Sequence, residues 1–102
     1  MPVSLQVAYP VSEDSTFDLD YYLSSHMALV GKHMGPYIES TLVTKGLAGG
    51  PNVPAPFHAI ATIVFKDQDA LNSALGDSAD VLADIPNFTN SKPQMLIGEV
   101  MG

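Results

Sequence analysis

The sequence contains no cysteine, no tryptophan and no arginine. Without cysteine there is no disulfide, no thiolate nucleophile and no cysteine-ligated zinc or iron–sulfur site. Without arginine the chain lacks the planar fork that binds a carboxylate or phosphate through two hydrogen bonds. The four cationic residues are all lysines and the net charge is -7, so we expect no nucleic-acid partner. These absences favour a neutral or weakly polar small molecule as the ligand.

Long hydrophobic runs are also missing. No apolar run approaches the ~20 residues that cross a bilayer, and the first residues lack the basic start of a signal peptide. We therefore expect a cytoplasmic protein without a membrane partner. The glycines form neither of the common phosphate-binding motifs. With 102 residues and a hydrophobic content of 46%, the chain is expected to form one globular domain, residues 1–102.

Hydrophobic periodicity predicts four strands and two helical regions. Alternating apolar residues predict strands at 3–9, 37–47, 57–65 and 95–101. A helix is predicted from Asp18, a good N-cap, to the stop at Gly35-Pro36. Two shorter helical pieces are predicted at 67–75, after Asp67, and at 78–84. The order βαββαβ predicts an α+β ferredoxin-like sandwich, with both helical regions on one face of an antiparallel four-stranded sheet.

The strand at 57–65 is apolar on both faces. Ala59, Ala61, Ile63 and Phe65 point one way, and Ile60, Thr62 and Val64 point the other way. An open sheet normally shows polar residues on the face that no helix covers. The chain has no spare element to cover this face, so we expect a homodimer whose sheets pack face to face as a barrel. The alternative is a central strand with mild apolar exposure.

The predicted helix places a histidine among its apolar residues. At about 100° per residue, one arc about 160° wide contains His26 with eight other residues: Leu19, Tyr22, Leu23, Met27, Leu29, Val30, His33 and Met34. The opposite arc contains Asp20, Tyr21, Ser24, Ser25, Ala28 and Lys32. His26 is therefore either a buried histidine bonded to a backbone carbonyl or part of a pocket.

Several segments together resemble the EthD family. They are the helix start at 17–27 with its Tyr-Tyr-x-x-His, the segment 83–90 with Asp-Ile-Pro-Asn-Phe-Thr, and Gly98-Glu99-Val100. Gly46-Leu47, Gly49-Gly50-Pro51 and the strand ending at Phe65 also fit. The resemblance covers nearly the whole chain and implies a dimeric α/β barrel with a cleft. The family is named after ethyl tert-butyl ether degradation. The wider group includes cofactor-independent monooxygenases, isomerases, cyclases, dehydratases and haem-degrading enzymes, so the resemblance implies no single reaction.

The candidate catalytic residues are His26, Tyr22 and Asp84. Tyr22 and His26 lie four residues apart on the predicted helix and are therefore neighbours. The imidazole can move a proton near neutral pH, and the phenol can hydrogen-bond a developing oxyanion. Asp84 can orient a histidine; alternatively it caps a helix end. The candidate ligand-binding residues are Tyr9, Leu29, Val30, His58, Asn87 and Phe88, with His58 at the cleft mouth and Phe88 in the core or the pocket wall.

No protein-built metal site is expected. His33 lies two turns after His26, about 10.5 Å along the helix axis, and neither histidine has a neighbouring ligand motif. We expect no cofactor, although a haem held by one histidine stays an alternative.

The sequence leaves two functional hypotheses. One is a cofactor-free enzyme that binds a neutral hydrophobic or phenolic molecule and acts as an isomerase, dehydratase, cyclase or monooxygenase. The other is a non-catalytic accessory protein that binds such a ligand, haem or a partner enzyme.

Overall fold

A computed structural model describes the chain from Met1 to Gly102. Its strands are β1 (Val3–Pro10), β2 (Ile38–Lys45), β3 (Phe57–Phe65) and β4 (Gln94–Glu99). They form one antiparallel sheet in the order β2-β3-β1-β4. The helical segments are α1 (Leu19–Tyr21), η1 (Tyr22–His26), α2 (Met27–Met34), η2 (Gly35–Tyr37), α3 (Gln68–Gly76), α4 (Ala79–Asp84) and η3 (Ile85–Asn87). The predicted α+β ferredoxin-like fold is confirmed.

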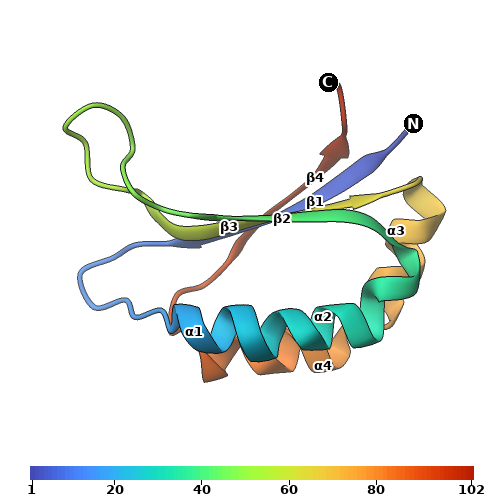
Figure 1. The fold of residues 1–102 in the computed structure, drawn as a ribbon, viewed down its shortest axis with the longest axis horizontal. Helices are drawn as coiled ribbons and strands as arrows, with labels where there is room; N and C mark the ends of the chain where they lie inside the picture. The colour runs from blue at the N-terminus through green and yellow to red at the C-terminus, as the bar shows by residue number, and fades with distance from the viewer.

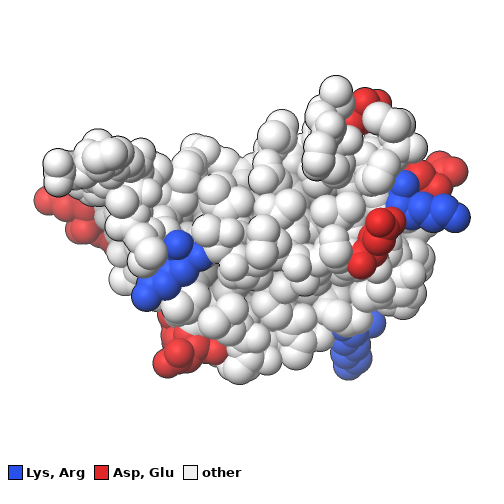
Figure 2. Space-filling model, turned by 45° about the horizontal axis from the view of Figure 1, so that its top comes forward, with Lys and Arg blue, Asp and Glu red and all other residues white.

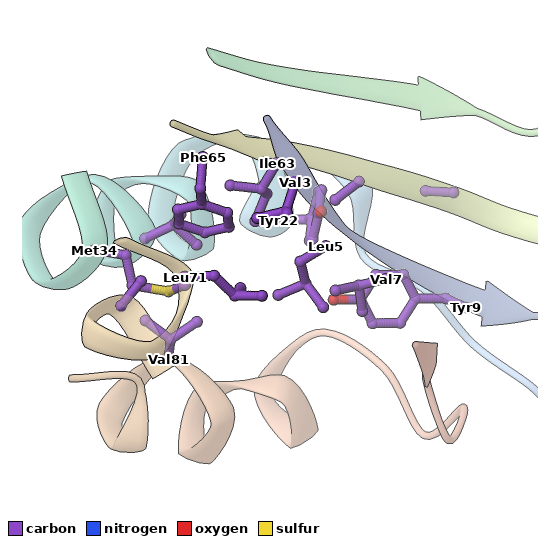
Figure 3. Close-up of a cluster of buried hydrophobic side chains, with 14 of the residues drawn as sticks. Val3, Leu5, Val7, Tyr9, Tyr22, Met34, Ile63, Phe65, Leu71 and Val81 are labelled. Carbon is purple, nitrogen blue, oxygen red and sulfur yellow. The ribbon is translucent and has the colours of Figure 1, made fainter. Parts of the chain in front are cut away.

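The helices lie on one face of the sheet, as Figure 1 shows. Burial alternates along β1 and β3 because successive side chains of a strand point to opposite faces. The buried set from the two strands packs against residues of the helices, among them Met34, Leu71 and Val81 (Figure 3). Asp18 and Asp67 cap the first and second helical regions, accepting from the amides of Tyr21 and Ala70. None of the helices is long and apolar enough to span a bilayer.

No helix of the chain covers the other face of the sheet (Figure 1). Strand register places on it a set of residues none of which is charged: Ser4, Gln6, Ala8, Ser40, Leu42, Thr44, Ile60, Thr62, Val64, Gln94, Leu96 and Gly98. Leu42 and Leu96 are 64% and 62% exposed there. Figure 2, turned so that this side comes forward, shows a broad uncharged surface with the charged residues near its margins. The loop between β2 and β3 rises on this side of the sheet (Figure 1).

The first helical region is not the continuous α-helix that the periodicity predicts. Residues 22–26 form a π-turn, in which the Met27 amide bonds the Tyr22 carbonyl five residues back. A π-turn is wider than an α-turn, so the residues within it and before it are rotated out of their predicted positions. Two assignments to the helix arcs are therefore wrong. Leu23 is 52% exposed although it was expected in the core. Tyr21, expected on the solvent side, packs against the core.

Two strands also differ from their predicted form. The sequence places Ile38 and Ser40 on one face, but the register shifts between them, so Ile38 pairs with Phe65 and packs against the core. Such a bulge inserts one extra residue and turns the next side chains to the other face. β2 also ends at Lys45 and β4 at Glu99, two residues earlier than predicted in each case. The simple alternation rule does not detect a bulge.

Candidate functional site

A cavity of about 100 Å³ lies between the sheet and the helices. Of the 16 residues that line it, 14 are hydrophobic, and the other two are His26 and Ser78. The hydrophobic lining residues are Leu5, Val7, Tyr9, Tyr22, Met27, Val30, Met34, Ala61, Ile63, Leu75, Val81, Leu82, Ile85 and Met95. Three of these, Leu75, Leu82 and Met95, are 38%, 48% and 50% exposed. The cavity therefore reaches the surface where α3 and α4 face the edge strand β4.

His26 forms part of the cavity wall and is only 4% exposed. Its ring stacks on Tyr22, with ring centroids 5.3 Å apart, and contacts Phe88 at 4.6 Å. Its Nδ1 lies 3.0 Å from Oδ2 of Asp84. A carboxylate only accepts hydrogen bonds, so the proton of the neutral ring belongs on Nδ1. The only hydrogen bond of the ring is the one at Nδ1, and no buried side-chain nitrogen or oxygen lacks a partner. Nε2 therefore keeps accessible surface, and its lone pair is available at the cavity that His26 lines.

Asp84 lies at the end of α4 and is itself buried. Besides His26, two groups donate to it: the Asn87 amide at 3.0 Å and the Tyr21 hydroxyl at 2.7 Å, both to Oδ1. The Asn87 hydrogen bond, and then those of Tyr21 and His26, hold the pKa of Asp84 below its usual range although burial acts in the opposite direction. Asp84 is therefore a carboxylate at neutral pH, as an orienting partner of a histidine must be.

Two buried phenols complete the polar groups of the cavity. Burial raises the pKa of Tyr22 to about 12. Burial and the neighbouring Tyr22 raise the pKa of Tyr9 above its usual range as well. Both phenols therefore stay protonated at any physiological pH. The interaction with Tyr22 that raises the pKa of Tyr9 engages the Tyr9 hydroxyl, so Tyr22 is the phenol that can donate a hydrogen bond to an oxygen atom in the cavity. The ring centroids of Tyr9 and Tyr22 lie 5.8 Å apart in an edge-to-face arrangement, which fixes the two rings against each other.

The structure gathers most, but not all, of the candidate residues at this site. Four line the cavity: Tyr9, Tyr22, His26 and Val30. Three lie behind the histidine, where Asp84 and Asn87 form a hydrogen-bonded group and Phe88 contacts the ring. The other two, Leu29 and His58, do not line the cavity. Leu29 is a partly buried residue packed against the core.

His58 takes part in a separate arrangement at the start of β3. Its Nε2 lies 2.8 Å from the Ser15 hydroxyl, and its ring stacks on Phe17 with centroids 5.5 Å apart. The same serine hydroxyl bonds within its own turn, at 2.9 Å from the Ser12 carbonyl and 2.8 Å from the Ser12 amide. His58 is thus held by the loop that precedes the first helical region.

The sequence did not indicate that Tyr21 contacts Asp84. On a regular α-helix it lies on the side opposite His26, whereas the π-turn brings its hydroxyl to the same carboxylate. The adjacent pair Tyr21-Tyr22 is the only signal in the sequence. It does not distinguish which phenol faces the cavity and which faces Asp84.

The residues of the site do not suit a metal or a haem. No group of three or more histidine, aspartate or glutamate side chains is placed to hold a metal ion. The cavity of about 100 Å³ is smaller than the roughly 300–1,000 Å³ clefts that take drug-sized ligands, and a haem is larger than such ligands. A haem on Nε2 of His26 therefore does not fit between the sheet and the helices.

The fold and site define a ferredoxin-like α+β protein with an apolar cavity and a buried histidine–aspartate pair in its wall. The EthD domain model matches residues 12–92, so the chain belongs to the EthD family. It is similar to an EthD-like protein of Ralstonia eutropha JMP134, with 31% identity and a TM-score of 0.90 over 99% of this chain and 93% of the other. An ethyl tert-butyl ether degradation family protein of Bacillus halodurans C-125 is 23% identical, with a TM-score of 0.78 over 99% and 100% of the two chains.

More distant solved structures share the fold alone. A cofactor-independent oxygenase of Streptomyces nogalater is 12% identical, with a TM-score of 0.64 over 99% of this chain and 94% of that one. A dimeric ferredoxin-like protein of Thermobifida fusca YX is 10% identical, with a TM-score of 0.63 over 98% and 92%. No curated protein matches the chain.

Proposed function

We propose that this protein binds a small neutral molecule, apolar or phenolic, beside His26 and transfers a proton to or from it without a cofactor. One observation carries the proposal. Asp84 holds Nδ1 of His26 at 3.0 Å, which is the only hydrogen bond of the ring, and the ring lines an apolar cavity. A base held in one tautomer beside an apolar cavity is the arrangement that general base catalysis needs.

The proton transfer follows from the roles of three side chains. Nε2 of His26 accepts a proton from an O–H group or from a C–H group next to a carbonyl. The imidazolium that forms is stabilised by Asp84 without any movement of the ring. The Tyr22 phenol, whose pKa burial raises to about 12, remains a donor and stabilises the oxygen on which negative charge develops. Return of the proton to another atom of the ligand completes the cycle.

The lining of the cavity defines the ligand class. It contains no cation and no carboxylate, so an ionised ligand would lose its hydration without gaining a counter-ion. An engineered apolar cavity of roughly 150 Å³ takes benzene. A cavity of about 100 Å³ that opens between α4 and β4 therefore limits the ligand to about one six-membered ring, part of which lies in the opening.

We propose the proton transfer itself, which is common to several complete reactions. Removal of a proton from a phenol or from carbon next to a carbonyl is the opening step of isomerisation, dehydration, cyclisation and cofactor-free oxygenation alike. The Streptomyces nogalater neighbour carries out the last of these by its description, and it supports the scaffold only.

Cyclohexanone in deuterated buffer tests the proposal. We expect the protein to accelerate incorporation of deuterium beside the carbonyl by about 10²–10⁴-fold, the usual contribution of a positioned base. Proton NMR measures the rate. His26→Gln should abolish the acceleration, whereas His33→Gln, on the same helical region and partly exposed, should leave it unchanged. Equal rates in wild type and His26→Gln would contradict the proposal, provided both melt cooperatively.

A second candidate function is ligand binding without catalysis. The lining offers one titratable base and no acid that gives up its proton near neutral pH, because burial raises the pKa of Tyr22 to about 12 and the Ser78 hydroxyl already donates to the Leu75 carbonyl at 2.7 Å. A protein that stores or delivers an apolar intermediate needs no more than this. Cyclohexanone that raises the melting temperature of the protein without deuterium incorporation would favour this second function.

We also propose that the uncovered face of the sheet binds a second copy of the chain. The face has no charged residue and carries the exposed Leu42 and Leu96, which is unusual for a surface left in water. The Thermobifida fusca neighbour is described as dimeric, which supports a dimer but not a particular interface.

Thr62→Glu should convert such a dimer to a monomer. Thr62 lies at the centre of the face, on β3 opposite Gln6 of β1 and Leu42 of β2, so a carboxylate there would be buried without a partner. Sedimentation velocity at micromolar concentration measures the change. Ala28→Glu adds the same charge on the exposed side of α2 and serves as the control. A wild-type monomer, or a Thr62→Glu dimer as tight as wild type, would contradict the proposal.

A further inference from the structure

Asp84 can orient His26 only if its own carboxylate is held in place. The structure assigns its two oxygen atoms to different partners. Oδ2 faces Nδ1 of His26 at 3.0 Å. Oδ1 accepts from the Tyr21 hydroxyl at 2.7 Å and from the Asn87 amide at 3.0 Å. Rotation of the carboxylate would disturb all three hydrogen bonds, so the donors on Oδ1 keep Oδ2 directed at the histidine.

The Tyr21 side chain is fixed at both ends. Its hydroxyl bonds Asp84, and its ring stacks on Phe88 with centroids 6.4 Å apart and an interplanar angle of 23°. Phe88 also contacts the His26 ring. The hydrogen bond to Asp84 raises the pKa of Tyr21, so the phenol stays a donor. Tyr21 therefore contacts two groups that in turn contact His26: the Asp84 carboxylate and the Phe88 ring.

The π-turn makes this contact possible. Residues five apart on an α-helix point about 140° away from each other, so Tyr21 and His26 would not meet one carboxylate. In η1 the Met27 amide bonds the Tyr22 carbonyl, five residues back, and the wider turn brings the two side chains to one side. The Ser24 hydroxyl also donates to the Asp20 carbonyl at 2.7 Å, a bond that favours a distorted turn. Such turns are frequent at functional sites.

We infer that Tyr21 is a positioning residue for the Asp84–His26 pair, and that the π-turn at residues 22–26 is the structural feature that brings it there. The effect of Tyr21 on reaction rate rests on the proposed function. Its effect on the orientation of Asp84 and on the tautomer of His26 does not depend on any reaction.

The test compares Tyr21→Phe with Tyr37→Phe. Tyr37 also donates its hydroxyl to an aspartate, Asp77, at 2.8 Å, but that aspartate has no contact with His26. The two variants therefore lose the same kind of hydrogen bond at different places. Nitrogen-15 NMR reports the tautomer of His26, and carbon-13 NMR of the side-chain carboxyls reports the titration of Asp84. Cyclohexanone exchange reports the rate in the same samples.

In wild type and Tyr37→Phe we expect His26 to carry its proton on Nδ1 when neutral. In Tyr21→Phe we expect a second tautomer to be populated and Asp84 to titrate at higher pH, because a donor to its charged form is gone. The exchange rate should fall about tenfold in kcat with KM unchanged, the loss expected for one hydrogen bond to a charged group.

Identical His26 and Asp84 spectra in Tyr21→Phe and Tyr37→Phe would overturn the inference. Altered spectra in Tyr21→Phe, combined with no exchange activity in wild type, would support the positioning role and reject the proton-transfer proposal. The failures of the two claims are therefore distinguishable.

Discussion

Asp84→Asn should slow cyclohexanone exchange by about 10²–10⁴-fold, in line with the loss when the aspartate of a serine-protease triad becomes asparagine. The reason is the position of the proton on His26. Tyr21 donates to Oδ1 and an asparagine retains an oxygen for it, so the new amide group faces Nδ1. An amide donates, which forces Nδ1 to accept and moves the ring proton to Nε2. The nitrogen at the cavity then no longer has a lone pair for catalysis.

The control for this variant lies on the same helix. Asp80 is paired with His33 at 3.4 Å and is 74% exposed, so Asp80→Asn removes an Asp–His contact without touching the cavity. Its exchange rate should equal that of wild type. Binding of cyclohexanone should survive in Asp84→Asn, because Asp84 does not line the cavity. A rate within threefold of wild type in Asp84→Asn would remove the aspartate from the mechanism.

Ala61→Leu should abolish ligand binding and stabilise the protein. Ala61 lies on β3, is 4% exposed and lines the cavity. Each carbon added within the cavity buries apolar surface worth about 0.8 kcal/mol. Three added carbons should therefore stabilise the protein by about 1 kcal/mol after packing strain. Cyclohexanone should then bind at least tenfold more weakly.

The loss of ligand binding in Ala61→Leu, together with its gain in stability, would distinguish a functional cavity from a packing defect. Thermal denaturation measures the stability and calorimetric titration measures the binding. Ala83→Leu adds the same carbons on the exposed side of α4 and should change neither the stability nor the cyclohexanone affinity by much. A cavity kept at a cost in stability is typical of a binding site. Unchanged cyclohexanone affinity in Ala61→Leu would place the ligand elsewhere.

Much of the fold could be predicted because local chemistry determines it. Alternation along β1 and β3 follows from the two-residue period of a strand, and Asp18 and Asp67 cap helices in the manner expected of their side chains. The stacking of Tyr22 on His26 follows from their spacing of four residues. These features need no knowledge of distant residues.

The remaining features depend on contacts between distant parts of the chain. His26 and Asp84 are 58 residues apart, so the sequence suggested Asp84 as an orienting residue without identifying its partner. The π-turn at 22–26 widens the helix at the residues that contact Asp84 and Phe88. No local sequence pattern predicts this turn. Tyr21 was therefore assigned to the wrong side. The volume of the cavity depends on how all the elements pack, which periodicity does not describe.

Titration of wild-type protein, labelled with nitrogen-15 at histidine, with phenol tests the proposed site most directly. Phenol has one ring and one O–H group, and it fits the ligand class that the cavity lining defines. We expect the Nε2 resonance of His26 to shift saturably as phenol binds, while His33 and His58 stay unchanged. A His26 resonance that does not respond to saturating phenol, or a response confined to His58, would show that the cavity beside His26 is not the ligand site.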